Sequence, residues 1–228
     1  MGEESLDNAM QDQIEALVSS LLDEDEIAVA ERLDFLIETE KGMWKAWALL
    51  EQVLPVFWIV EGEYLHTRAP VFVYRTLYYL NHPQEFVRNP RYMIFMMGNH
   101  LEGLLVHLLN LRNRPLGDLS HSLYKINQTK LSASLLNFNA IYRRTKHMSG
   151  DPLLEKRLDH RTFSTRDAIY CLFITRNLSM QLFDLLKKSG KPLSEEWKPI
   201  DPQWFTWNSE EPISHGRRVI SKSQQPEM

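Results

Sequence analysis

The chain has little of what several protein classes require. Its 228 residues include one cysteine, Cys171, so a disulfide framework is impossible, as is usual in a reducing compartment. No apolar run approaches the roughly eighteen residues that cross a bilayer, and the acidic start lacks the basic and apolar regions of a secretory signal. Glycine is sparse, and no glycine-rich phosphate loop occurs. We therefore expect a cytoplasmic protein without a membrane partner.

Neither sign of charge dominates. Lys and Arg number 26 against 30 Asp and Glu, which gives a formal net charge of −4. This balance excludes a wholesale binder of polyanions and leaves room only for a local basic patch. The apolar share of 43% and the charged share of 25% are ordinary for a globular protein. A chain of this length can bury a core of normal size.

Apolar residues at helical spacing are plentiful. They recur about every 3.6 residues, and most of the resulting segments end at Pro, Gly or Asn. The segment from Pro90 is apolar over most of its circumference and should be the central helix. Residues 57–60 fit either a short strand or a buried helical turn. The expected helices cover approximately residues 8–22, 23–41, 43–53, 70–82, 90–113, 116–127, 131–147 and 164–188.

The pattern predicts an all-α fold: a mostly antiparallel multi-helix bundle over residues 1–190. Beyond it, residues 191–228 should form a Pro/Trp-rich extended C-terminal arm whose aromatic side chains pack on the bundle. The last dozen residues are expected to be disordered. The arm's distinguishing residues are Pro192, Pro199, Pro202 and Pro212 with Trp197, Trp204, Phe205 and Trp207.

Three local predictions concern packing. Ser164 and Asp167 match a capping box at a helix start, with Asp in place of the usual Glu or Gln. Gly98 and Gly103 are expected to allow close helix contacts. Asn99 and His100, within an apolar helix, should form a buried hydrogen-bonded pair.

Polar residues form a stripe on the helix that ends near residue 147. Asn139, Arg143 and His147 follow one another at intervals of four and so share a face, with Lys146 beside them. A cation close to a histidine is suited to binding a phosphate.

Two charges, Asp167 and Arg176, interrupt apolar faces of the last long helix. A buried charge persists only when it is paired. If this helix runs antiparallel to the one before it, Asp167 comes within reach of Arg143 or His147. A histidine held by a carboxylate could then act as acid or base on an RNA 2′-hydroxyl. The alternative is that these residues only tie down the turn between the helices, His147 being favoured there by the helix dipole.

The pair Arg143-x-x-x-His147 near the end of one of two long helices resembles the HEPN superfamily (higher eukaryotes and prokaryotes nucleotide-binding). Its members are small all-α domains, many of them metal-independent endoribonucleases in toxin–antitoxin and phage-defence systems. The resemblance implies that Arg143 and His147 are the catalytic residues. Further positions look like a pattern of uncharacterised bacterial helical proteins and would support them: Asn139, Lys146, His160, Asp167 and Arg176.

No metal or cofactor is expected. His100 and His107 share a helix face, but Glu102 points elsewhere, and no Glu-x-x-His pairing accompanies them. Cys171 lies in an apolar run where an inert, buried thiol is the normal state.

A different class of function remains open. Aromatic residues outside the expected core favour a protein–protein or homo-oligomer surface, although the aromatic tail could instead fold back on the body. The leading hypothesis is thus a HEPN-like protein that binds or cleaves RNA. The rival is a non-catalytic interaction module or subunit of a larger assembly. The aromatic residues in question are Trp58, Tyr64, Phe72, Tyr74, Tyr78 and Tyr79.

Overall fold

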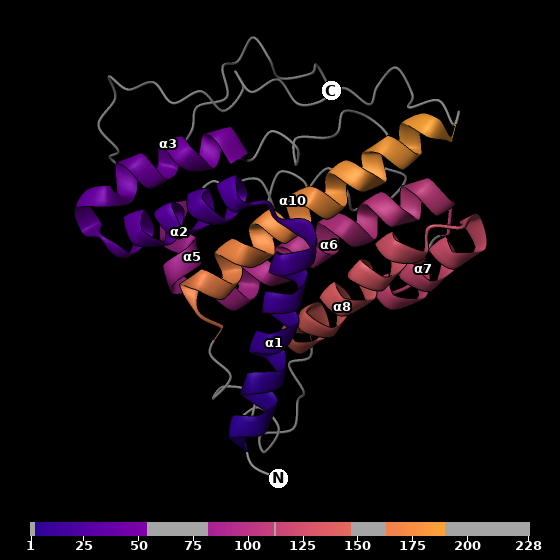
Figure 1. Ribbon diagram of the computed structural model, residues 1–228, viewed down its shortest axis with the longest axis horizontal. Helices are drawn as coiled ribbons and strands as arrows, with labels where there is room; N and C mark the ends of the chain where they lie inside the picture. The colour runs from indigo at the N-terminus through magenta and orange to yellow at the C-terminus, as the bar shows by residue number, and fades with distance from the viewer. Residues whose placement is uncertain (1–2, 54–81, 112, 147–162, 190–228) are drawn as a thin grey trace, which may run out of the picture.

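Eight α-helices and two 3-10 helices make up nearly all of the regular structure in the computed structural model, which describes residues 3–53, 82–111, 113–146 and 163–189 (Figure 1). No strand occurs in these ranges, so the all-α prediction is confirmed. The helices are α1 (Glu3–Leu21), α2 (Glu24–Glu38), η1 (Glu40–Gly42), α3 (Met43–Val53), α5 (Pro83–Arg88), α6 (Pro90–Leu109), α7 (Leu116–Ser122), η3 (Leu123–Ile126), α8 (Thr129–Lys146) and α10 (Thr165–Lys188).

Helices α6 and α10 lie side by side at the centre of the bundle (Figure 1). Thr165 donates to the carbonyl of Phe86 just before α6, and His100 contacts Ser179 further along. The two residues of each pair are 79 positions apart in the sequence. Because this separation is the same in both pairs, α6 and α10 run parallel to each other. The predicted central helix is confirmed, and it forms a parallel pair within the bundle.

Helices α7 and α8 pack against α6, and α8 also contacts α10 (Figure 1). Ser132 donates to the carbonyl of Ser120, while Gly117 faces Asn139, so α7 and α8 are antiparallel. The predicted apolar stripe of α8 is buried and packs into the core; its members are Leu131, Leu135, Phe138 and Tyr142.

A close helix contact lies at Gly98. A Cβ at this position would stand 2.1 Å from Cδ2 of Tyr142, so only glycine lets α6 and α8 approach this closely. The Tyr142 hydroxyl then donates to Oδ1 of Asn99 at 2.7 Å. The prediction for Gly98 is confirmed. The predicted Asn99–His100 pair is wrong, because the two side chains point to different helices and bond to α8 and α10 respectively.

Helix starts follow the capping chemistry of the sequence. Asp23 accepts from the backbone N–H of Glu26 at 2.8 Å, and Glu26 accepts from that of Asp23 at 3.2 Å. Ser164 and Asp167 exchange the same two bonds at 3.1 and 2.8 Å. The predicted capping box at Ser164 is confirmed, because the shorter Asp side chain still reaches the N-cap N–H.

Some expected boundaries differ. Helix α1 begins several residues earlier than the pattern predicts. Helix α5 is not predicted, because Pro83 and Pro90 indicate the end of one helix and the start of the next. Proline occupies the first turn of both α5 and α6, where its missing N–H is harmless. The predictions for residues 57–60, for most of 70–82 and for the arm at 191–228 lie outside the described residues. No described helix combines the length and apolarity needed to cross a bilayer.

Candidate functional site

The stripe predicted on α8 is present only in part. Arg143 is exposed and makes no hydrogen bond or ion pair with any residue in the described ranges. Asn139 is half-buried against Gly117 of α7, its Nδ2 standing 3.0 Å from the position of a Cβ there. Lys146 is the last residue of α8. His147 and His160 lie outside the described residues, so the proposed Arg143–His147 pair stays a prediction.

Asp167 has a structural partner. Its carboxylate accepts the backbone N–H of Ser164 at 2.8 Å, and only 5% of the residue is exposed. The charge is stabilised by this bond and by the positive end of the α10 dipole. The described residues give no contact between Asp167 and Arg143, and the role that they show for the carboxylate is to cap α10. A contact with His147 lies outside the described residues.

Arg176 is also paired, as expected for a charge on an apolar face, and its partner is a carboxylate of α2. Its Nη1 lies 2.9 Å from Oε1 of Glu26 on α2, and Nδ2 of Asn177 reaches both oxygens of the same carboxylate at 2.9 and 3.0 Å. Glu26 also closes the cap of α2. One carboxylate therefore joins the middle of α10 to the start of α2. The described residues thus give structural roles to two of the predicted supporting positions.

The buried histidine of α6 does not fit acid–base chemistry at neutral pH. His100 is almost fully enclosed, and its Nε2 lies 3.1 Å from the buried hydroxyl of Ser179. Burial lowers its pKa to about 4, so the ring is neutral. Burial and Glu102 also raise the pKa of Tyr142, which keeps its hydroxyl as the donor to Asn99. This polar layer ties together α6, α8 and α10.

The thiol and the metal readings find no support in the described ranges. Cys171 is buried, and burial followed by the charge of Asp167 raises the pKa of its thiol, which opposes formation of a nucleophilic thiolate. No group of three or more His, Cys, Asp or Glu residues that could hold a metal ion occurs among the residues that the structure describes.

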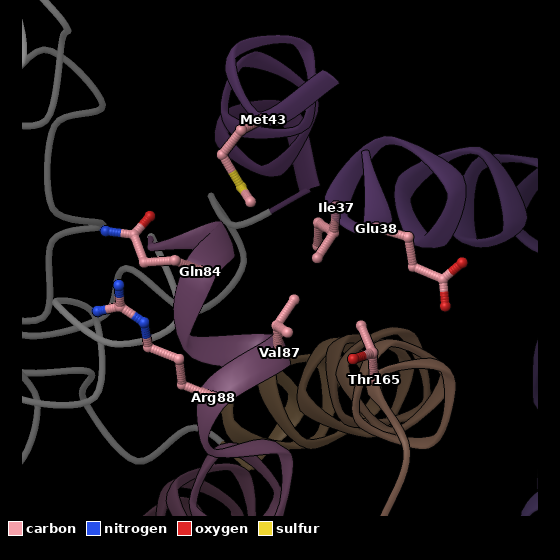
Figure 2. A pocket seen from close by; sticks show the side chains of 7 residues that line it. All are labelled: Ile37, Glu38, Met43, Gln84, Val87, Arg88 and Thr165. Atoms are coloured by element: carbon pink, nitrogen blue, oxygen red, sulfur yellow. The ribbon is translucent and has the colours of Figure 1, made fainter. Parts of the chain in front are cut away.

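An open groove lies where α2, α3 and α5 meet the first residue of α10. We call it the α2–α5 groove; its volume is about 580 Å³. Figure 2 shows Ile37, Met43 and Val87 pointing from three helices toward a shared space, with Thr165 at its edge. Val87 is 49% exposed, although it is apolar. A half-exposed apolar side chain on the wall of an open groove is suited to contact with a further apolar group.

Charged groups flank the α2–α5 groove on opposite sides. Arg88 and Gln84 extend to one side of the apolar centre and the Glu38 carboxylate to the other (Figure 2). Two further apolar residues near it in the chain are exposed, Phe35 at 66% and Trp44 at 50%. The arrangement can bind an apolar side chain between two charges of opposite sign.

Sequence reasoning missed this groove for a physical reason. Val87, one of its three apolar lining residues, comes from α5, a helix of six residues that is too short to show a period. The available signal was local: Pro83 at the first helical turn, Glu85 two residues later, and Val87-Arg88 before Asn89. Ile37 and Met43 were assigned to neighbouring helices, but nothing in the spacing indicates that they face α5.

Comparisons of the chain with family models, with curated proteins and with solved structures give no match.

Proposed function

We propose that this chain is a non-catalytic interaction module whose α2–α5 groove binds a segment of a partner protein. One observation carries the proposal: Ile37, Met43 and Val87 converge on an open space of about 580 Å³ between three helices. A catalytic function has less support, because two of the residues predicted to assist it have structural contacts. Asp167 caps α10, and Arg176 joins α10 to α2.

The charges around the groove define the chemistry of the partner. Arg88 favours a carboxylate on one side, and Glu38 favours a Lys or Arg on the other. The partner segment should therefore carry an apolar anchor residue between an acidic and a basic residue. Such spacing suits an amphipathic helix laid into a groove, a common mode of peptide recognition.

The energetics are consistent with a specific but reversible contact. Burying one Leu-sized anchor contributes about 1.5–3 kcal/mol, and covering the exposed half of Val87 adds about 1 kcal/mol. The flanking charges, exposed to solvent, contribute about 0.2–1 kcal/mol each. Losing the anchor contact should weaken binding at least tenfold.

The test uses a photo-crosslinking residue at position 87 in the full chain, with the same residue at Met180 as the control. Met180 is an apolar residue of similar exposure, 43%, on α10 and does not line the groove. We expect position 87, and not position 180, to crosslink one protein through a segment with the charge–apolar–charge pattern. Equal crosslinking at both positions would contradict the proposal. Crosslinking to a second copy of the chain would identify a homo-oligomer and overturn the choice of partner.

Binding or cleavage of RNA is our second candidate function, and one specific observation supports it. Arg143 is exposed near the end of α8, and Arg144 and Lys146 are close to it in the sequence of a chain with net negative charge. A local group of cations is typical of nucleic-acid binding. A HEPN-like ribonuclease needs such a cation beside His147.

Its test compares the wild-type chain with Arg143→Ala and His147→Ala, measuring RNA integrity and thermal melting together. RNA cleavage that disappears in both variants at unchanged melting temperature supports the nuclease. An intact RNA substrate with wild-type protein removes this candidate and leaves the interaction module.

A further inference from the structure

One wall of the α2–α5 groove carries two polar side chains that no described contact uses. Gln84 and Arg88 stand one turn apart on α5 and extend to the same side of the apolar centre (Figure 2). Neither makes a hydrogen bond or an ion pair with any residue in the described ranges. The amide and the guanidinium are therefore both free to contact a bound segment.

The space beside them is larger than a small aliphatic side chain can fill. The volume of the groove is about 580 Å³. A void left beside a bound side chain forfeits the contacts of the atoms around it. An aromatic side chain buries about 150–250 Å² and so covers more of such a wall. The volume therefore favours an aromatic anchor over an aliphatic one.

The apolar wall also suits a ring. Met43, at the start of α3, is half-buried and directs its thioether into the groove toward Ile37 and Val87 (Figure 2). A methionine side chain is flexible, and its sulfur makes favourable contacts with aromatic rings. Val87 is half-exposed, so a ring between it and Met43 would cover apolar surface that is otherwise in water.

Arg88 and Gln84 distinguish one aromatic residue from the others. A guanidinium attracts the face of an aromatic ring, most strongly that of tryptophan, and its edge stays free for the acidic residue of the partner. The indole N–H of tryptophan donates a hydrogen bond and needs an acceptor when it is buried. The amide oxygen of Gln84 supplies that acceptor, whereas phenylalanine has no group to donate to it.

We propose that the anchor residue of the partner segment is a tryptophan. Its ring lies between Met43 and Val87 with one face toward Arg88, and its indole N–H donates to Gln84. This inference rests on the proposed function of the α2–α5 groove and specifies the residue that the groove recognises.

The test uses three uncharged probes: N-acetyltryptophanamide, N-acetylphenylalaninamide and N-acetylleucinamide. Each aromatic amide is titrated into the full chain at millimolar concentration, and NMR follows the isotope-labelled methyl group of Met43, which a nearby ring shifts. The methyl group of Met180, on α10 outside the groove, is the control. The leucine amide is measured by its competition with the tryptophan amide. We expect the tryptophan amide to shift Met43 and not Met180, and to bind about threefold or more better than the other two amides.

Gln84→Leu tests the hydrogen bond to the indole. It should weaken binding of the tryptophan amide roughly threefold to tenfold, because one hydrogen bond is lost, and leave the phenylalanine amide within about twofold. The matched control is Gln181→Leu, the same change at an exposed glutamine of α10 that does not line the groove. It should leave every affinity unchanged. Melting curves show that each variant is folded.

Three results would overturn the inference: equal binding of the tryptophan amide and either other amide, equal weakening of both aromatic amides by Gln84→Leu, or no shift of Met43 with any amide. The proposed function is decided separately, by the crosslink at position 87. A crosslinked segment with an aliphatic anchor would overturn the tryptophan and leave the interaction module standing, whereas a segment anchored by tryptophan would support both.

Discussion

The guanidinium of Arg176, in the middle of α10, lies 2.9 Å from the carboxylate of Glu26, in the first turn of α2. The same carboxylate accepts the N–H of Asp23 and the amide of Asn177. Its contacts therefore join two helices that are 150 residues apart in sequence. A charge that sequence reasoning placed in a functional cluster is instead part of the connection between α2 and α10.

Replacing Arg176 tests this connection. The pair is partly exposed, with 29% and 17% of the two side chains accessible, so its loss should cost only about 1 kcal/mol. For a chain of this size, Arg176→Met should lower Tm by about 2–4 °C. Glu26→Ala should cost more, about 2 kcal/mol, because it also opens the cap of α2. The double variant should be less destabilised than the sum of the two, as measured by denaturant unfolding; strict additivity would mean that the pair does not interact.

His100 should make stability depend on acid. Its pKa is about 4 in the folded chain and 6.5 when unfolded, so the unfolded state binds the extra proton between these values. The free energy of unfolding is therefore highest above pH 6.5 and should fall by about 3 kcal/mol as the pH drops to 4. Unfolding by urea across this range measures the fall. His100→Gln keeps a donor for Ser179 and removes the titration, so it should flatten the curve; an unchanged slope would exclude His100 as the cause.

Gly98→Ala should be strongly destabilising, although alanine normally favours a helix. The new Cβ would lie 2.1 Å from the Tyr142 ring, which is fixed by its bond to Asn99. Overpacking of this kind costs about 1–3 kcal/mol. Gly117→Ala is the matched control, because its Cβ would meet only the end of the Asn139 side chain at 3.0 Å. Thermal melting should separate the two; similar melting temperatures would mean that α6 and α8 adjust freely.

Asp167 and Arg143 should contribute to stability independently. Asp167→Ala removes the cap bond to Ser164 and should cost about 1–2 kcal/mol. Arg143→Ala, at an exposed position, should change stability by less than about 0.5 kcal/mol. In a double-variant cycle their coupling energy should be near zero. A coupling of about 1 kcal/mol or more would restore the predicted contact between α8 and α10 and, with it, the case for a catalytic group.

Period and capping predicted most of the helices because both are local. The stripe through Leu131, Leu135, Phe138 and Tyr142 requires only helical geometry, and the Ser164–Asp167 box is closed within one turn. The partner of a charged residue, by contrast, can lie far away in the sequence. A charge on an apolar face needs a partner, but the sequence position of Arg176 does not indicate that the partner is Glu26, 150 residues away.

The α2–α5 groove could not be predicted from the sequence for a related reason. Val87 belongs to a helix too short to show periodicity, and its neighbours in the α2–α5 groove come from α2 and α3. A pocket between helices depends on how the helices cross, which spacing along one helix does not specify.

The central claim is that the α2–α5 groove recognises a partner segment through an apolar anchor between two charges. The most direct measurement uses the purified partner that the crosslink identifies. Its Kd is measured for the wild-type chain and for Arg88→Glu. It is measured a third time for Arg88→Glu with a partner in which the acid that faces Arg88 has been changed to a basic residue. We predict a loss of affinity of about fivefold with the single change and recovery with the pair. Equal affinity in all three cases would contradict the account.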